Sequence, residues 1–191
     1  MKYISVFCGS SSGAERIFAE QATILGRTIA RKGYGIVYGG AHVGLMGAVA
    51  NGALSEKGEV IGVIPRFLQR KELEHKSLTR IYIVDTMHER KAMMNELCDA
   101  VIALPGGYGT MEELFEMLTW GQLSLHKKPI ALLNVDGFYD PLVAFSEKMI
   151  EKGFLKEEYR DLLIVDDDIE KLLSRMESYV PPKNEKWFET K

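Results

Sequence analysis

AVIALPGGYGTMEELFEMLTWGQL, residues 100–123, shows most directly how this chain folds. Residues 100–104 are continuously apolar, as expected of a strand in a parallel sheet that is covered on both faces. A glycine-rich turn follows at 105–110, and the residues after it are typical of a helix. A strand, a tight turn and a helix, in this order, form the repeating unit of an α/β fold.

The same unit recurs along the whole chain. Short apolar runs predict strands at residues 3–8, 35–38, 60–64, 81–84, 100–104 and 130–133, and residues 163–165 are a candidate seventh. Longer segments between them predict helices at residues 15–32, 44–57, 88–98, 110–125, 139–152 and 168–179. The polar, irregular residues 65–78 are expected to form a loop over one edge of the sheet. We therefore predict a single doubly wound α/β domain, residues 1–180, with a mainly parallel sheet, helices on both faces and a tail at 181–191.

The composition is that of an ordinary globular protein with one domain. Of the 191 residues, 46% are hydrophobic, which is enough for a full core, and the formal net charge of −3 does not indicate a nucleic-acid partner. No apolar run approaches the roughly 18 residues that a membrane span requires, and the first residues are typical of a strand rather than a signal peptide. The two cysteines, Cys8 and Cys98, have no CxxC partners. We expect a cytoplasmic protein without membrane contacts.

Three of the predicted strands end in glycine-rich turns that begin helices. The turns are CGSSSG at residues 8–13, GGAHVG at 39–44 and PGGYGT at 105–110. In an open α/β sheet, ligands bind beyond the carboxyl ends of the strands, and glycines let backbone N–H groups approach a phosphate at a helix N-terminus. Tight geometry would explain any one of these turns alone, but the three together predict a phosphate- or nucleotide-binding crevice.

Several familiar sites are absent from the sequence. It contains no GxxxxGK[ST] for a P-loop nucleotide hydrolase. It also has neither GxGxxG in the first turn nor an acidic residue after the second strand, as a dinucleotide site would require. The four histidines, at positions 42, 75, 88 and 126, lack the spacing of metal ligands, and no motif marks a nucleophilic serine or cysteine. We expect neither a metal nor an organic cofactor.

Carboxylates crowd the start of the helix that follows the third turn. Glu112, Glu113 and Glu116 lie in its first turns, next to the expected crevice. Thr110 and Glu113 also have the spacing of a capping box, in which both side chains only stabilise the helix end. A carboxylate at this place is, alternatively, suited to contact sugar hydroxyls or a developing positive charge. On the residues alone, both interpretations stay open.

A basic pair begins another helix. Arg90 and Lys91 lie at the start of the predicted helix 88–98, and two cations at a helix N-terminus oppose its dipole. An anionic ligand would explain them, whereas a solvated basic pair is the simpler alternative. We expect the strand that precedes this helix to neighbour the strand that ends at Leu104, so that the basic pair lies near the same crevice.

These segments resemble those of a known family. PGGYGTMEE at residues 105–113 is similar to the motif PGGxGTxxE of the Lonely Guy family, and MHERK at 87–91 is similar to its segment MHxRK. Three further segments resemble the same family: VFCGSS at 6–11, YGG at 38–40 and GLMG at 44–47. Members are Rossmann-like homodimers that hydrolyse cytokinin riboside 5′-monophosphates to free cytokinin and ribose 5-phosphate. The resemblance covers about residues 3–180 and implies the same fold and activity here.

The resemblance also implies roles for particular residues. Arg90 and Glu113 would form the catalytic pair. A carboxylate beside the sugar stabilises the oxocarbenium character at C1′ or activates water, and Arg90 would hold the ribose or assist departure of the base. Backbone N–H groups of residues 107–110 would bind the 5′-phosphate. The residues expected to contact substrate are Gly9, Ser10, Glu72, Lys91, Gly106, Gly107, Tyr108, Gly109, Thr110, Met111, Glu112 and Thr119.

Other functions and the choice of base stay open at this level. Relatives have carried the label lysine decarboxylase, which would require a Schiff-base lysine for pyridoxal phosphate, and no lysine here stands out in such a setting. A non-catalytic nucleotide-binding or carrier module of the same fold is the alternative to a hydrolase. The sequence does not indicate whether the base is plain adenine or N6-prenylated adenine.

A homodimer is expected on two grounds. Members of the similar family are homodimers, and the helix from Thr110 carries more apolar side chains than one sheet face requires. These side chains are Leu114, Phe115, Leu118, Trp120 and Leu123.

Overall fold

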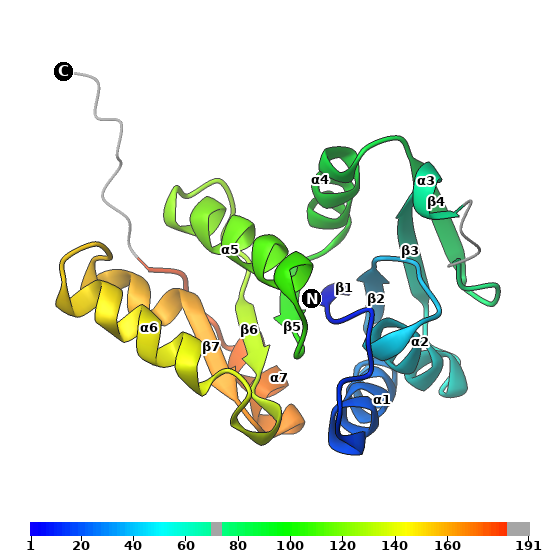
Figure 1. The fold of residues 1–191 in the computed structure, drawn as a ribbon, viewed down its shortest axis with the longest axis horizontal. Coiled ribbons are helices and arrows are strands. Elements are labelled where there is room, and N and C mark those ends of the chain that lie inside the picture. Colours follow the sequence, from blue (N-terminus) through cyan, green and yellow to red (C-terminus); the bar gives the residue numbers. More distant parts are fainter. Residues whose placement is uncertain (70–73, 183–191) are drawn as a thin grey trace.

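Seven parallel strands form the sheet at the centre of the computed structural model, which describes residues 1–69 and 74–182 (Figure 1). The strand order is β4-β3-β2-β1-β5-β6-β7, and every neighbouring pair is parallel. The strands are β1 (Tyr3–Phe7), β2 (Gly35–Tyr38), β3 (Val60–Pro65), β4 (Arg80–Val84), β5 (Ala100–Ala103), β6 (Ile130–Leu133) and β7 (Leu163–Asp166). The predicted strands are confirmed, the candidate seventh among them.

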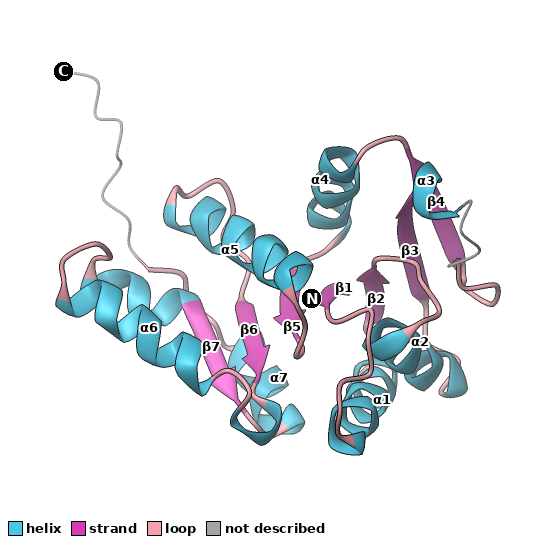
Figure 2. Ribbon diagram, viewed as in Figure 1, coloured by secondary structure: helices cyan, strands magenta, loops and turns pink. Residues whose placement is uncertain are grey.

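Helices cover both faces of this sheet (Figure 2). α1, α2 and α7 pack on one face, and α4, α5 and α6 pack on the other. The helices are α1 (Arg16–Arg31), α2 (Gly44–Ser55), α3 (Arg66–Gln69), α4 (Met87–Leu97), α5 (Tyr108–Gln122), α6 (Asp140–Glu151) and α7 (Ile169–Glu177), with short 3₁₀ helices η1 (Val135–Gly137) and η2 (Glu157–Leu162). The predicted doubly wound α/β fold is confirmed.

The strands divide their side chains between two cores, because successive residues of a strand point to opposite faces. In β1, Val6 belongs to the core under α1 and α2, whereas Phe7 belongs to the core under α4 and α5. In β5, Ile102 and Val101 are divided in the same way. Burial on both faces explains why the central strands are continuously apolar in the sequence. β4 lies at an edge and is more exposed.

The order of the strands reverses between β1 and β5. From β1 the chain passes through β2 and β3 to β4 at one edge, and it then returns across the sheet to β5 before reaching β7 at the other edge. At such a switch point, the turns that follow the two central strands diverge and leave a crevice beyond their carboxyl ends. The glycine-rich turns at residues 8–13 and 105–110 follow these two strands, so the crevice lies between them.

Two expectations about the chain before α4 are wrong. β4 does not neighbour β5, because β3, β2 and β1 lie between them. α4 nevertheless reaches the centre of the molecule, since it crosses back over the sheet in contact with β3, β2 and β1. Residues 65–78 are not wholly a loop either: Pro65 ends β3, and α3 follows it directly.

The predicted tail, residues 181–191, lies outside the described residues from residue 183 onward. In the described part of the chain, no helix combines the length and the apolar character that crossing a membrane requires.

Candidate active site

Backbone hydrogen bonds join the three glycine-rich turns into one wall. The N–H of Gly9, after β1, donates to the carbonyl of Pro105, after β5, over 3.1 Å. The N–H of Leu45, at the start of α2, donates to the carbonyl of Gly9 over 3.1 Å. The turn after β1 is therefore held between the other two, and the three turns meet as the sequence predicts.

The close approach of these turns requires two of the glycines. A Cβ at Gly106 would lie 2.1 Å from Oγ1 of Thr110 and 2.9 Å from the backbone N of Gly9. A Cβ at Gly44, whose φ is +58°, would lie 2.3 Å from the carbonyl carbon of Ser10. A side chain at either position would force the turns apart, because interiors are close-packed.

A cavity of about 400 Å³ opens along this wall. The start of α5 forms one part of its lining, the turn after β1 forms a second part, and Gly39 after β2 forms a third. Among the residues expected to act on or bind substrate, the cavity is lined by Gly9, Ser10, Arg90, Gly107, Tyr108, Gly109, Thr110, Glu112 and Glu113. The crevice predicted from the three turns is therefore present, and most of the predicted site residues meet in it.

An ion pair lies in the lining of this cavity. Nη2 of Arg90, in α4, is 3.4 Å from Oε1 of Glu113, in α5. The two side chains are almost buried, with exposed fractions of 11% and 10%. Burial raises the pKa of Glu113, and the neighbouring guanidinium of Arg90 offsets this effect only in part. The carboxyl is therefore suited to exchange a proton closer to neutral pH than a surface carboxyl would.

The guanidinium of Arg90 has more donors than acceptors around it. Nη1 donates weakly to Sδ of Met87 over 3.8 Å. Nε is buried and has no hydrogen-bond partner in the described part of the chain. Arginine presents five N–H donors and a permanent positive charge, which suits phosphates and sugar oxygens. Since Arg90 lines the cavity, it has donor capacity for a ligand there.

α5 begins at Tyr108. The sequence predicts a start at Thr110, two residues later. Gly107 is its N-cap in an extended conformation, no side chain caps the helix, and Thr110 already lies inside the first turn. The capping-box interpretation of Thr110 and Glu113 is therefore wrong. The first N–H groups of a helix have no partner within it, so the start of α5 offers donors and the positive end of the helix dipole to an anion.

Lys91 bridges α4 and α5 instead of lining the cavity. Its ammonium donates to Oε1 of Glu112 and, over 3.1 Å, to Oε1 of Glu116. Burial lowers the pKa of Lys91, but the hydrogen bonds to Glu112 and Glu116, together with the negative charges of these two residues, outweigh burial, and that pKa is raised. Glu112 does line the cavity, so Lys91 contacts a residue of the lining without belonging to it.

Two other predicted contacts lie outside the lining. Gly106 is behind it, between Gly9 and Thr110. Met111 packs against the core under α4 and α5. Glu72 lies outside the described residues.

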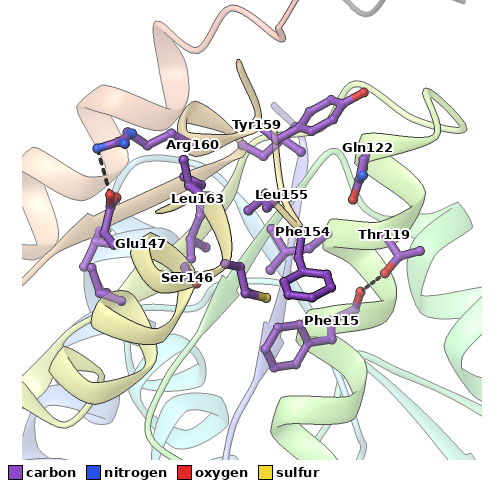
Figure 3. A pocket seen from close by; sticks show the side chains of 16 residues that line it. Phe115, Thr119, Gln122, Ser146, Glu147, Phe154, Leu155, Tyr159, Arg160 and Leu163 are labelled. Atoms are coloured by element: carbon purple, nitrogen blue, oxygen red, sulfur yellow. Dashed lines mark hydrogen bonds and ion pairs between the residues drawn. The ribbon is translucent and has the colours of Figure 1, made fainter. Parts of the chain in front are cut away.

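Thr119 lies at a different place on α5 (Figure 3). It lines a second cavity, of about 310 Å³, whose walls come from α5, α6, η2 and β7 and include Phe115 and Phe154. Its hydroxyl donates to the carbonyl of Phe115 over 2.7 Å. Within one chain, the structure does not bring Thr119 to the Arg90–Glu113 cavity.

The sequence does not predict the apolar part of the active-site lining. Its members include Met46 from α2, Ile64 from β3, Leu68 from α3 and Met87 from α4. Ile64 could have been found, because it lies at the carboxyl end of a predicted strand. Leu68 could not, because its segment carries no helical pattern long enough to recognise.

The described side chains do not group into a metal site. Among residues 1–69 and 74–182, no three His, Cys, Asp or Glu side chains are grouped so as to hold a metal ion. Nε2 of His75 is 3.1 Å from Oδ1 of Asn51, and Nε2 of His126 is 2.9 Å from the carbonyl of Met117.

Comparison with known proteins relates the chain to one family. Residues 46–176 match the family model described as "possible lysine decarboxylase". The chain is 48% identical to the probable cytokinin riboside 5′-monophosphate phosphoribohydrolase LOGL1 of Oryza sativa subsp. japonica, over 92% of this chain and 79% of that protein. It is 44% identical to the cytokinin riboside 5′-monophosphate phosphoribohydrolase LOG2 of Arabidopsis thaliana, over 93% of this chain and 84% of that protein.

Solved structures share the fold at lower identity. The molybdenum cofactor binding protein of Rippkaea orientalis has a TM-score of 0.71 and 22% identity, over 93% of this chain and 96% of that chain. Such a likeness establishes the architecture and leaves function to be argued from the site. The much higher identity to the Oryza and Arabidopsis proteins, over most of both chains, shows that this chain belongs to the family of the cytokinin riboside 5′-monophosphate phosphoribohydrolases, the Lonely Guy family.

Proposed function

We propose that this protein hydrolyses the N-glycosidic bond of cytokinin riboside 5′-monophosphates and releases the free base and ribose 5-phosphate. The named relatives carry this activity in their names. The structural observation that carries the proposal is the buried pair Arg90–Glu113, which lines the same cavity as the N-terminus of α5. A carboxylate, a cation and an anion-binding helix end are the groups that this reaction needs together.

Glu113 would act on the sugar. Breaking the bond between the base and C1′ builds positive charge on the ribose. A carboxylate beside the ribose stabilises this charge or takes a proton from the attacking water. The water oxygen then bonds to C1′, the electron pair of the C–N bond leaves with the base, and the base gains a proton from Glu113 or solvent. The raised pKa of Glu113 suits this exchange, because a base is most effective when its pKa lies near the working pH.

The rest of the cavity would hold the substrate. The 5′-phosphate suits the start of α5, where Gly107, Tyr108 and Gly109 line the cavity. The remaining donors of Arg90 suit the ribose oxygens or a ring nitrogen of the base. The apolar lining, with Met46 as a member, suits the base and an apolar N6 substituent.

A decarboxylase, the activity in the name of the family model, would need a lysine that forms a Schiff base with pyridoxal phosphate. Lys91 is poorly suited to this role, because its raised pKa keeps it protonated and its ammonium donates to Glu112 and Glu116. The likeness to molybdenum cofactor carriers supports the fold alone. A hydrolase therefore fits the side chains of the cavity best.

We also propose that the protein is a homodimer and that the second copy covers the surface around the cavity that contains Thr119. Apolar side chains of its lining are exposed there: Phe115 on α5 and Phe154 after α6, of which Phe154 is 87% exposed. Exposed apolar surface of this kind is typical of interfaces.

Both cysteines are unpaired, which supports the cytoplasmic location that we propose.

A panel of nucleoside 5′-monophosphates tests the proposed reaction. AMP and N6-prenylated AMP would be incubated with the purified protein, and ribose 5-phosphate and free base would be measured. We expect both products in equal amounts. Tight binding without turnover would favour a carrier, and an absorbance band of bound pyridoxal phosphate would favour the decarboxylase.

A further inference from the structure

Gly39, the residue after β2, lies directly against the guanidinium of Arg90. A Cβ built on Gly39 would lie 2.1 Å from Nη2 of Arg90 and 3.1 Å from its Cζ, whereas ordinary Cβ contacts begin at 3.4 Å. Nη2 is also the atom that faces Glu113, at 3.4 Å. The guanidinium therefore occupies the space that any side chain at this position would fill.

The backbone itself does not demand glycine here. Gly39 is absent from the residues with positive φ, whereas Gly40, next to it, has a φ of +76°. An L-residue adopts negative φ without strain. The contacts that a Cβ on Gly39 would make are with the side chains of Arg90 and, at 3.1 Å from Sδ, Met46. What this glycine provides is room for those side chains.

Arg90 depends on this room because few polar contacts fix it. Its side chain is almost buried, yet its Nε has no partner in the described residues, and Nη1 faces only a weakly accepting sulfur. A guanidinium held by one ion pair and a poor acceptor takes its position largely from the shape of its surroundings. The flat face left by Gly39 is part of that shape.

We propose that Gly39 is a positioning residue, in which the absence of a side chain sets where the guanidinium of Arg90 lies relative to Glu113. Its kinetic consequence rests on the proposed function, but its consequence in the free protein does not. With alanine at position 39, Nη2 must withdraw by about 1 Å or more, and a misplacement of this size can cost about 100-fold in rate.

The first test compares two Gly→Ala variants of the same strand region. Gly39→Ala should lower kcat for the monophosphate by about 100-fold, with a much smaller change in KM. Gly35→Ala, at the other end of β2, is the matched control, because its Cβ would lie 2.4 Å from Cδ1 of Tyr3, a similar overlap far from the cavity. We expect Gly35→Ala to keep near-normal kcat. Equal losses of kcat in the two variants would overturn the proposal.

The second test removes the side chain with which the new methyl group would collide. In an Arg90→Ala background, Gly39→Ala should cost nothing further in kcat, because interacting residues are not additive. The double variant should fold even if Gly39→Ala alone does not. A further loss of tenfold or more in the double variant, or its failure to fold, would show that the methyl group acts on something other than Arg90.

The third test needs no activity. The Glu113 carboxyl would be titrated by NMR in the ligand-free protein. Because the charge of Arg90 lowers the pKa of Glu113, withdrawal of the guanidinium should raise that pKa in Gly39→Ala and leave it unchanged in Gly35→Ala. This readout distinguishes failure of the inference from failure of the proposed reaction. An unchanged titration of Glu113 in Gly39→Ala would overturn the proposal.

Discussion

Replacing Glu113 by glutamine separates charge from shape in the cavity. Glutamine keeps the size of the side chain and an acceptor oxygen for Nη2 of Arg90, but it removes the negative charge that lies 3.4 Å from that atom. If this charge stabilises the ribose cation or takes a proton from water, its loss should lower kcat by about 10²–10⁴-fold. We therefore expect a loss of at least about 100-fold.

The free energy of unfolding should change much less. Loss of one partner from a fully buried ion pair costs about 3–5 kcal/mol. Here the pair lines an open cavity, the amide oxygen still accepts from Arg90, and the desolvation that raises the pKa of Glu113 is relieved. We expect a loss of about 2 kcal/mol or less, which for a chain of this length lowers Tm by no more than about 8 °C.

Glu116→Gln is the matched control. Glu116 lies three residues further along α5 and is 3.1 Å from Nζ of Lys91, but it does not line the cavity. The Glu116→Gln variant should keep near-normal kcat, although it loses the ion pair between Glu116 and Lys91. Initial rates and thermal unfolding would be measured on the same preparations. A Glu113→Gln protein that folds and turns over at more than about a third of the parental rate would refute the role of this carboxylate.

kcat/KM should fall at acid pH as Glu113 gains a proton. Because burial raises the pKa of Glu113, this fall should begin at higher pH than for an ordinary glutamate. A fall at acid pH that persists in Glu113→Gln would contradict this assignment. Gly106→Ala should raise KM for the monophosphate about 10-fold or more, because its Cβ would displace Thr110 and the anion-binding turn; an unchanged KM in initial-rate measurements would speak against phosphate binding there. Phe154→Asp should give a monomer of 21.5 kDa by light scattering at micromolar concentration. The control Ile24→Asp, which changes an exposed residue of α1, should stay dimeric like the parent. A monomeric parent would disprove the dimer.

The strands were predictable because a strand that is buried on both faces is continuously apolar in the sequence. β5 and β6 are buried at every residue and are apolar without interruption. The start of α5 was not predictable to the residue. Its N-cap is Gly107, which contributes only backbone, whereas Thr110 has a side chain that suggests a cap. Thr110 instead lies inside the first turn, with its hydroxyl next to Gly106.

The position of β4 shows where local patterns stop being informative. Consecutive strands are usually neighbours, and the expectation that β4 lies beside β5 agrees with this general tendency. After β4 the chain instead crosses back over the sheet to β5, and the sequence of a single strand does not indicate this crossing. The expectation that the basic pair reaches the crevice holds for Arg90 alone, because α4 crosses the sheet.

The charged residues of the site were predictable, whereas the pairing of Lys91 with Glu112 and Glu116 was not. Arg90, Glu113 and the glycine-rich turns carry recognisable chemistry at fixed spacing. Lys91 carries the same charge as Arg90, yet it is neutralised by Glu112 and Glu116 from another helix. Such contacts join residues far apart in the chain, so they form only in the folded protein and leave no pattern in the sequence. The same holds for the contact of Gly39 with Arg90.

Product analysis tests the central claim most directly. N6-prenylated AMP and the corresponding nucleoside would be supplied separately, and free base, ribose 5-phosphate, nucleoside and inorganic phosphate would be quantified by chromatography and mass spectrometry. Cleavage at C1′ with the phosphate bound at the start of α5 predicts base and ribose 5-phosphate in equal amounts from the monophosphate, and little conversion of the nucleoside. Release of inorganic phosphate with an intact nucleoside, or equal turnover of nucleoside and monophosphate, would contradict it.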